Sequence, residues 1–256
     1  MRLVAAFALA LAAGAVPAEE TEWRVPFITT PGEVVERMLQ LAGTQAGDTV
    51  LDLGSGDGRI VIAAAQKFGA RAMGIELDAG LVERSRENAR RAGVADRVSF
   101  VQGDVLTSDI SAATVVTVYL LPQLIGRLQP RFVDELRPGT RIVSHAFGMA
   151  GWKPDRAETM SLSKPHRGQG DESTLFLWIV PADARGTWEG DGLRLRIEQN
   201  YQQIEVEGAK RARLSGTDIS WESAEGRFRG RVEGERMIGE MLGAGGALPL
   251  VLTRRR

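Results

Sequence analysis

The chain of 256 residues contains no cysteine, which excludes a disulfide framework, a thiolate zinc site and a cysteine nucleophile. Its only histidines are His145 and His166, too few for a histidine-rich metal centre, so we expect no metal. An excess of positive charge is also missing, because 32 Lys and Arg face 33 Asp and Glu. Nonspecific binding to nucleic acid depends on neutralising phosphates, so we expect no nucleic-acid partner.

A single apolar run at the N-terminus stands apart from this balance. It covers Leu3–Val16, 14 residues, with Arg2 before it and acidic residues after it. The run is shorter than the about 20 residues of a membrane-spanning helix, and Ala18 is a small residue after which a signal peptidase can cut. We therefore expect a signal peptide at residues 1–18 and export to the periplasm. An uncleaved segment that associates with the membrane is the alternative.

Between residues 19 and 183, strand-like and helix-like segments alternate. This order predicts an α/β fold, with a mostly parallel sheet and helices on both faces. Thr30 and Glu33 have the spacing of a capping box, which predicts the start of the first helix. Pro130 is expected to bend or split the last helix. Strands are predicted at 49–53, 71–77, 98–102, 114–120, 141–147 and 174–180, with a weaker one at 157–162, and helices at 31–42, 60–68, 79–91 and 122–136.

From residue 184 to residue 256 the pattern changes to short runs that alternate apolar and polar residues. Glycines lie between many of these runs, such as Gly192 before Leu193–Ile197 and Gly208 after Gln203–Val206. Alternation with period two is typical of antiparallel strands with one face toward solvent. We therefore predict a small antiparallel β module, of unknown role, that ends in a frayed tail at Arg254–Arg256.

The motif most specific for function is a glycine loop at residues 52–58, between a predicted strand and a predicted helix. Gly54, Gly56 and Gly58 alternate there with Ser55 and two aspartates. Arg59 stands where a nicotinamide-binding loop needs its third glycine, and no Gly-Lys-Ser/Thr follows for a phosphate loop. The loop is therefore either an ordinary tight turn or a site for a nucleoside-like ligand without a pyrophosphate.

Acidic residues follow the next two predicted strands. Glu76 ends the second strand, where a carboxylate can accept hydrogen bonds from both hydroxyls of a ribose. Gln102 and Asp104 end the third, and Asp104 is an acceptor for the exocyclic amine of a purine. Because ligands of open α/β sheets bind at the carboxyl ends of the strands, we expect these groups to line one crevice.

The order Asp52–Gly58, Glu76 and Asp104 resembles the class I S-adenosylmethionine (SAM)-dependent methyltransferases. A closer similarity is to the ATP-synthase c-subunit lysine methyltransferases and their bacterial relatives, and it spans about residues 25 to 180. The segments that carry it are Pro26–Pro31, Asp52–Ile60, Tyr119–Pro122 and Gly139–Val143.

This resemblance implies a Rossmann-like methyltransferase sheet and SAM as the cofactor. It implies that the glycine loop and Asp52 hold the methionine and ribose portion, that Glu76 binds the ribose hydroxyls, and that Asp104 is near the adenine. The cofactor-binding residues predicted in this way are Asp52, Gly54, Ser55, Gly56, Gly58, Glu76, Gln102 and Asp104.

The methyl acceptor is expected at the ends of the fourth and fifth strands, near Tyr119, Pro122, His145 and Trp152. Many amino-group methyltransferases have Asn or Asp before the proline, where this chain has Leu121. Methyl transfer needs mainly a collinear nucleophile and methyl group, so no dedicated catalytic acid or base is predicted.

Three functions compete at this level. The first is a SAM-dependent methyltransferase acting on a protein side chain, such as a lysine, or on a small molecule, with a membrane-proximal target among the options. The second is an exported, non-catalytic binding protein on a methyltransferase scaffold. The third, a nucleotide-dependent oxidoreductase, is disfavoured by Arg59.

Overall fold

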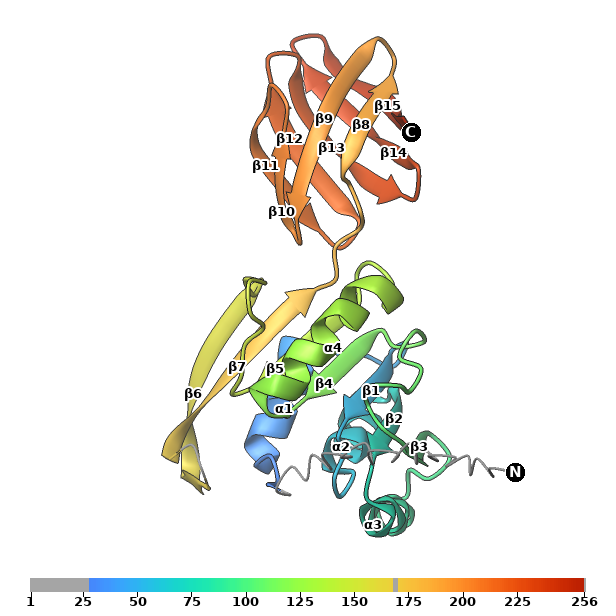
Figure 1. Cartoon of the computed structure of the whole chain (residues 1–256), viewed down its shortest axis with the longest axis vertical. Helices are drawn as coiled ribbons and strands as arrows, with labels where there is room; N and C mark the ends of the chain where they lie inside the picture. The colour runs from blue at the N-terminus through green and yellow to red at the C-terminus, as the bar shows by residue number, and fades with distance from the viewer. Residues whose placement is uncertain (1–27, 168–169, 256) are drawn as a thin grey trace, which may run out of the picture.

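The computed structural model describes residues 28–167 and 170–255, so the predicted signal peptide lies outside the described residues. The first part of the chain forms a seven-stranded sheet in the order β3-β2-β1-β4-β5-β7-β6 (Figure 1). Five strands are parallel, and β7 and β6 are antiparallel to their neighbours. The strands are β1 (Thr49–Leu53), β2 (Arg71–Glu76), β3 (Val98–Gln102), β4 (Val115–Val118), β5 (Arg141–His145), β6 (Arg156–His166) and β7 (Gly170–Ile179).

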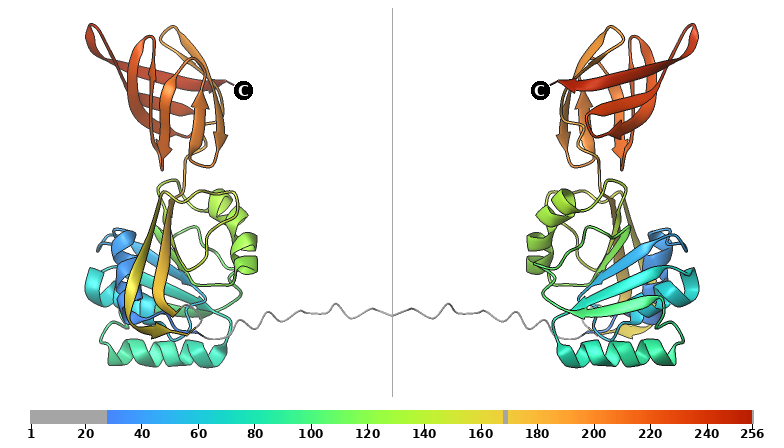
Figure 2. Two further views of the ribbon diagram at one scale, coloured as in Figure 1. Left: turned by 90° about the vertical axis from the view of Figure 1, so that its left-hand side faces the viewer. Right: turned by 90° about the vertical axis from the view of Figure 1, so that its right-hand side faces the viewer.

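Four helices cover both faces of this sheet, as predicted (Figure 2). One face packs against α1, α2 and α3 through residues such as Val50 and Ala72, whereas the opposite face packs against α4 through residues such as Leu51 and Val116. Successive strand residues point to opposite faces, so nearly continuous apolar strands supply both cores. The helices are α1 (Gly32–Leu41), α2 (Arg59–Phe68), α3 (Ala79–Arg91) and α4 (Pro122–Glu135).

The helix ends follow local rules with two exceptions. Asp78 caps α3 by accepting a hydrogen bond from the Leu81 amide, and Gly69 ends α2 with a positive φ. The predicted capping box at Thr30 is wrong, because α1 starts after Pro31 without a side-chain cap. The prediction that Pro130 splits α4 is also wrong, since α4 runs unbroken through it.

The antiparallel pair β6–β7 is longer than the sequence pattern predicted. The weak segment at 157–162 extends to His166, and β7 begins at Gly170. Because β6 lies at the edge of the sheet, only one of its sides pairs with another strand, and most of its polar residues are exposed. Because β6 contains few apolar residues, the sequence pattern predicted only part of this strand.

The last part of the chain folds as a second, antiparallel sheet in the order β10-β9-β8-β15-β14-β13-β12-β11. It encloses its own core around Trp188, Trp221 and Phe228. Strands β11 and β14 were not predicted, because charges and glycines interrupt their alternation. The strands are β8 (Gly186–Gly190), β9 (Leu193–Asn200), β10 (Gln203–Val206), β11 (Lys210–Ser215), β12 (Asp218–Ser223), β13 (Gly226–Glu233), β14 (Arg236–Gly243) and β15 (Gly246–Arg255).

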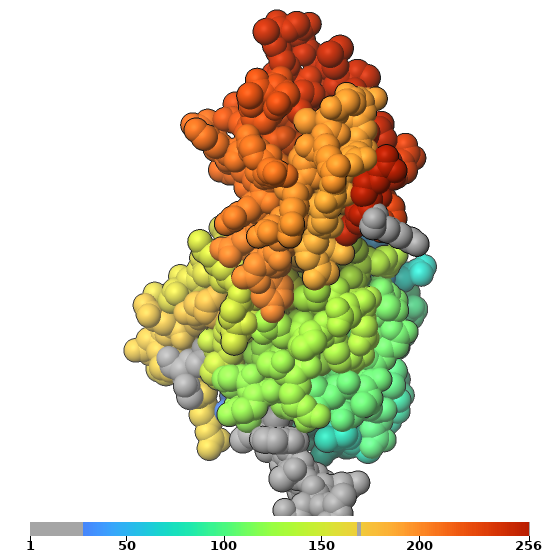
Figure 3. Space-filling model, turned by 45° about the horizontal axis from the view of Figure 1, so that its top comes forward, coloured from blue at the N-terminus to red at the C-terminus, as the bar shows by residue number. Residues whose placement is uncertain are grey.

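The two parts meet at the end of the first sheet where β7 leads into β8 (Figure 1), and the space-filling view shows the orange module lying directly against the green segment (Figure 3). The Trp152 ring stacks on the Tyr201 ring at 4.7 Å between centroids, and its Nε1 donates to Gln202 Oε1 at 2.9 Å. The Tyr201 hydroxyl accepts from Gln129 at 2.8 Å. Trp152 is therefore buried at this junction, and its predicted place near the acceptor is wrong.

The described residues contain no helix with the length and apolar character needed to cross a membrane. Within the same ranges, no three His, Cys, Asp or Glu side chains are grouped so that they could hold a metal ion.

The C-terminal arginines are built into the module, so the predicted frayed tail is wrong for the described residues. Strand β15 pairs with β8 as far as Arg255, opposite Thr187. The Arg254 guanidinium lies 4.8 Å from the centre of the Trp188 ring and donates to the Arg185 carbonyl at 2.7 Å. Its side chain is 14% exposed, whereas that of Arg255 is 65% exposed.

Replacing Arg254 by Ala should therefore lower the free energy of unfolding of the module by about 2 kcal/mol or more, through loss of charged hydrogen bonds and the cation–π contact. The matched control, Arg255→Ala, should cost less than about 1 kcal/mol, because its ion pair is exposed. Urea denaturation followed by tryptophan fluorescence measures both. Equal losses for the two variants would contradict the assigned role of Arg254.

Candidate active site

The glycine loop lies at the carboxyl end of β1 and crosses over the end of β2. The amides of Gly54 and Ser55 both donate to the Ile75 carbonyl, at 2.9 and 3.0 Å. Gly54, Gly56 and Gly58 have φ of 78°, 55° and 81°, a region that residues with a Cβ rarely adopt. The alternating glycines therefore give the loop a backbone path that other residues would strain.

Close packing adds a second requirement for glycine. A Cβ on Gly58 would lie 2.8 Å from the Phe100 ring, and one on Gly54 would lie 2.8 Å from Leu120 Cδ2. Gly74 on β2 has the same property, since its Cβ would meet the Ser55 side chain at 2.4 Å. The Ser55 hydroxyl is accordingly buried over Gly74 and makes no hydrogen bond to a described residue.

Two polar side chains of α3 donate hydrogen bonds to backbone carbonyls of the glycine loop. Ser85 Oγ donates to the Gly56 carbonyl at 2.9 Å, and Asn88 Nδ2 donates to the Asp57 carbonyl at 2.8 Å. Sequence reasoning missed both residues. Their spacing of three positions on a polar helix face was the available signal, because residues i and i+3 share one side of a helix.

Glu76 joins the loop to the end of β2. One carboxylate oxygen accepts from the Gly56 amide at 2.8 Å, and the other accepts from the Asp78 amide at 3.0 Å. A carboxylate has about four lone-pair sites, so both oxygens keep capacity for further donors such as ribose hydroxyls. The structure thus brings Glu76 and the glycine loop together, as the sequence predicted.

Asp52 lies inside β1, directly beside Thr117 of β4. Its side chain is buried, and Oδ1 accepts from the Thr117 hydroxyl at 2.7 Å. Burial is the main cause that raises the pKa of Asp52 from 3.8 to about 7, and the nearby charges of Glu76 and Asp57 add to it. A cationic ligand group here would stabilise the charged carboxylate.

Asp57 and Arg59 form a pair that sequence reasoning treated only as a departure from the dinucleotide motif. The Arg59 guanidinium donates twice to the Asp57 carboxylate, at 2.9 and 2.6 Å, and once to the Thr30 carbonyl at 2.8 Å. Burial alone would raise the pKa of Asp57, but the Arg59 contacts hold it below its usual range. Arg59 therefore connects the loop to the segment before α1.

The predicted adenine end lies after β3. Asp104 is exposed there, and its Oδ1 accepts from the Leu106 amide at 2.8 Å, which leaves the second oxygen at the surface. Gln102 is also exposed and donates to the Leu77 carbonyl at 3.3 Å. Leu77, which sequence reasoning missed, is 56% exposed directly after Glu76 and offers an apolar wall for a flat ring.

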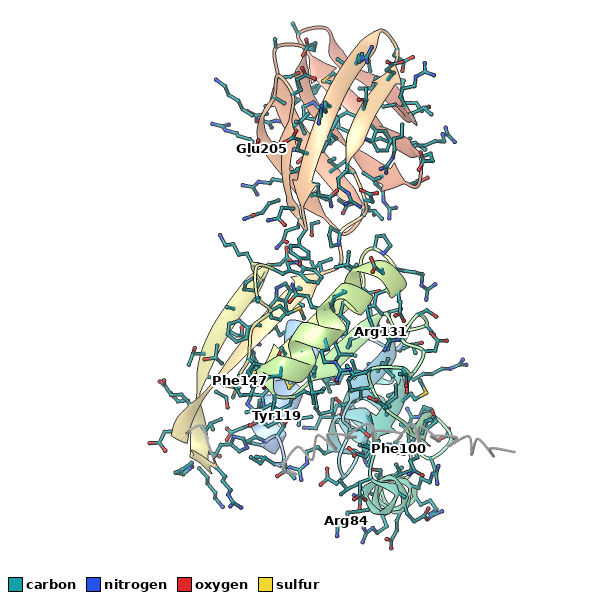
Figure 4. All side chains as sticks on the ribbon, in the orientation of Figure 1. Arg84, Phe100, Tyr119, Arg131, Phe147 and Glu205 are labelled. Atoms are coloured by element: carbon teal, nitrogen blue, oxygen red, sulfur yellow. The ribbon has the colours of Figure 1, made fainter. Side chains whose placement is uncertain are left out.

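The predicted acceptor end contains a group of four rings, of which Figure 4 labels Tyr119 and Phe147. The Tyr119 ring lies 4.2 Å from His145, 6.4 Å from Phe147 and 6.1 Å from His166, measured between centroids. We call these four residues the aromatic cluster. The His166 side chain is buried at the end of β6.

Hydrogen bonds fix His145 within the aromatic cluster. Its Nδ1 lies 3.4 Å from the Thr30 hydroxyl, and its Nε2 lies 3.1 Å from the Ser173 hydroxyl. Thr30 thus contacts His145 instead of capping α1, which explains why the capping box is absent. Glu33, the other residue of that motif, accepts from Ser163 of β6.

Pro122 begins α4 next to the cluster and is exposed, as is Leu121 before it. Proline suits the first helical position, where its missing N–H has no intrahelical partner. Leu121 has no polar side-chain atom, so an acceptor can be oriented here only by backbone oxygens or by other side chains.

Comparison with known proteins agrees with this geometry. Residues 52–156 match the model of the ANTKMT methyltransferase domain. A protein-lysine N-methyltransferase of Saccharolobus islandicus is 45% identical over 51% of this chain and 81% of its own length. The mouse lysine N-methyltransferase named for the ATP-synthase c-subunit is 37% identical over 51% of this chain, which spans about half (52%) of that enzyme.

A solved structure shares the arrangement of the first sheet. It is described as an RNA methyltransferase from Salinibacter ruber in complex with S-adenosyl-L-homocysteine, and it is 51% identical to this chain. The match covers 59% of this chain and 93% of the other, with a TM-score of 0.54. The cofactor product bound in that protein agrees with the loop and carboxylates described above.

Replacing Asp52 by Asn should stabilise the fold increasingly as pH rises. Below pH 3.8 the folded and unfolded chains both carry the Asp52 proton, but between 3.8 and about 7 only the folded chain keeps it. The free energy of unfolding of the wild type therefore falls across this window, by up to about 4 kcal/mol, and Asn removes that loss. Urea denaturation at pH 4, 6 and 8 measures the difference.

Asp104→Asn is the matched control, because it removes an exposed carboxylate from the same edge of the sheet. A difference between Asp52→Asn and wild type that stays constant from pH 4 to pH 8 would show that Asp52 is charged throughout.

Proposed function

The chain belongs to the family of SAM-dependent methyltransferases that includes protein-lysine N-methyltransferases, and we propose that it methylates the side-chain amine of a protein lysine. The observation that carries this proposal is the aromatic cluster beside the glycine loop, at one edge of the sheet. SAM supplies a methyl group on a positively charged sulfonium, so the donor needs no further activation.

The residues of the glycine loop fit such a cofactor. Positive-φ glycines leave room for a bulky nucleoside, and Glu76 keeps lone pairs for the ribose hydroxyls. Leu77 and Asp104 offer an apolar wall and an acceptor for the adenine. Asp52 is a buried carboxylate that a cationic ammonium would stabilise, which suits the methionine portion.

The residues at the acceptor end have to orient the lysine side chain and favour the neutral form of its amine. Holding two reactants in line at near-attack distance lowers the activation free energy by roughly 7–11 kcal/mol. A lysine amine has an ordinary pKa near 10.4, about three units above neutral pH, and its ammonium form has no lone pair for attack. The half-buried rings of Tyr119 and Phe147 disfavour a charged ammonium through desolvation.

An RNA acceptor is the second candidate, because one similar structure is described as an RNA methyltransferase. The formal net charge of −1 argues against it, since RNA affinity depends on neutralised phosphates. The relatives described as lysine methyltransferases favour the protein acceptor.

To test the acceptor, residues 19–256 are incubated with tritiated SAM and a total cell extract. We expect label in protein, and loss of that label when the lysine amines of the extract are first acetylated, because an amide nitrogen cannot accept the methyl group. Ribonuclease treatment should leave the label unchanged. Glu76→Ala is the control, because loss of its two amide contacts should weaken SAM binding at least about fivefold by calorimetry.

Label that is sensitive to ribonuclease and resistant to lysine blocking would replace the lysine proposal by the RNA alternative. No SAM binding by the wild type would contradict the assignment of the glycine loop as the cofactor site.

We further propose that the chain is exported through residues 1–18, with a membrane-proximal target. The support is the apolar run after Arg2 and the relatives named for the ATP-synthase c-subunit. N-terminal sequencing of the protein from separated cell fractions should give a periplasmic form that begins at Glu19. A cytosolic form that begins at Met1 would contradict export.

A further inference from the structure

His166 lies at the acceptor end although it is the last residue of an edge strand. Strand β6 is antiparallel to β7, and β7 is antiparallel to β5, so β6 ends at the same edge as the parallel strands. The His166 ring is 8% exposed and lies 5.6 Å from the His145 ring and 6.1 Å from the Tyr119 ring. Neither the glycine loop nor the cofactor site uses it.

Hydrogen bonding determines which ring nitrogen of His166 carries the proton. Nε2 lies 3.0 Å from the Thr29 carbonyl oxygen. A carbonyl oxygen only accepts hydrogen bonds, so Nε2 must be the donor, and Nδ1 of the neutral ring then carries a lone pair. Nδ1 is buried and has no partner among the described residues.

The two histidines of the aromatic cluster therefore differ. Both nitrogens of His145 face hydroxyl groups, those of Thr30 and Ser173. Only His166 presents a buried ring nitrogen without a hydrogen bond to a described residue, and leaving such an acceptor unsatisfied destabilises the folded state. Functional sites can keep an unsatisfied acceptor of this kind, because an incoming N–H donor supplies the missing hydrogen bond.

We propose that His166 Nδ1 accepts the proton of the incoming lysine ammonium, an inference that rests on the proposed lysine acceptor. The ammonium transfers one proton to Nδ1, which leaves a neutral amine and an imidazolium. The amine lone pair forms the new N–C bond while the C–S bond of SAM breaks and its electron pair stays on sulfur. The imidazolium then releases its proton to water.

A cavity next to His166 offers this proton a route to solvent. It has a volume of about 390 Å³ and lies between the start of α1 and the end of β6. Glu33 and Lys164 are the charged residues that line it, and His145 and Tyr119 are the titratable groups that face the ring from β5 and β4. The charges of Glu33 and Lys164 have opposite signs, so neither sign dominates around the ring.

The test compares His166→Gln with wild type. Glutamine keeps an N–H donor for the Thr29 carbonyl but has no basic nitrogen. The measured quantity is the initial rate of tritium transfer from saturating SAM to the cell-extract protein, from pH 6 to pH 10.5. Ser163→Ala is the control, since it removes a neutral hydroxyl from the same cavity.

At pH 7 we expect His166→Gln to be slower than wild type by a factor of about 10²–10⁴, the usual contribution of a positioned proton acceptor. The difference in rate between His166→Gln and wild type should shrink toward pH 10.4, where a lysine ammonium loses its proton to solvent. Added imidazole should partly restore the rate at pH 7. SAM affinity by calorimetry should be unchanged, and Ser163→Ala should follow the wild-type pH profile.

A deficit that is the same at every pH would assign His166 a structural role only, and no deficit would also overturn the proposal. If His166→Gln does not fold, His166→Asn at the same pH values makes the same comparison. The outcomes separate the two proposals, because a wild type that labels no lysine overturns both, whereas a wild type that labels lysine with an equally active variant overturns only this one.

Discussion

The site depends on one constraint, which is that the chain must cross from β1 to α2 directly over the end of β2. This path places the amides of Gly54 and Ser55 on the Ile75 carbonyl and requires positive φ at three alternating positions. A side chain at Gly58 would meet the Phe100 ring and one at Gly54 would meet Leu120, so the loop approaches these neighbours through backbone. The position of Glu76 under Gly56 follows from this path.

The same arrangement concentrates negative charge. Asp52, Asp57 and Glu76 lie close enough for the last two to raise the pKa of the first, and only Asp57 has an arginine partner among these described carboxylates. A fold selected for stability alone would avoid a buried carboxylate with a single hydroxyl partner. A positively charged ligand group at this site would stabilise the charged form of Asp52. Binding therefore favours a carboxylate at this position, whereas stability of the fold favours an uncharged residue.

Local patterns predicted the arrangement at the ends of β1 and β2 well. The glycine loop, Glu76 and the Asp78 cap depend on residues that are near one another in the chain, and the sheet with its helices followed from apolar periodicity. The acceptor half was harder, because Thr30 has one hydroxyl that either caps α1 or contacts His145, and only the packed structure selects the second. The edge strand that places His166 is polar, so periodicity gave a short, weak signal.

The residues that make these contacts lie at different distances from one another along the chain, and this affects the order in which the contacts can form during synthesis. Hydrogen bonds of Gly56 and Asp57 join residues 20 to 31 positions apart and that of Asp52 spans 65, whereas Thr30 to His145 and Thr29 to His166 span 115 and 137 positions. Closing longer loops costs more entropy, and such contacts form late. On the ribosome, a nascent chain can thus complete the glycine loop and its contacts while His145 and His166, at the proposed acceptor end, are still untranslated.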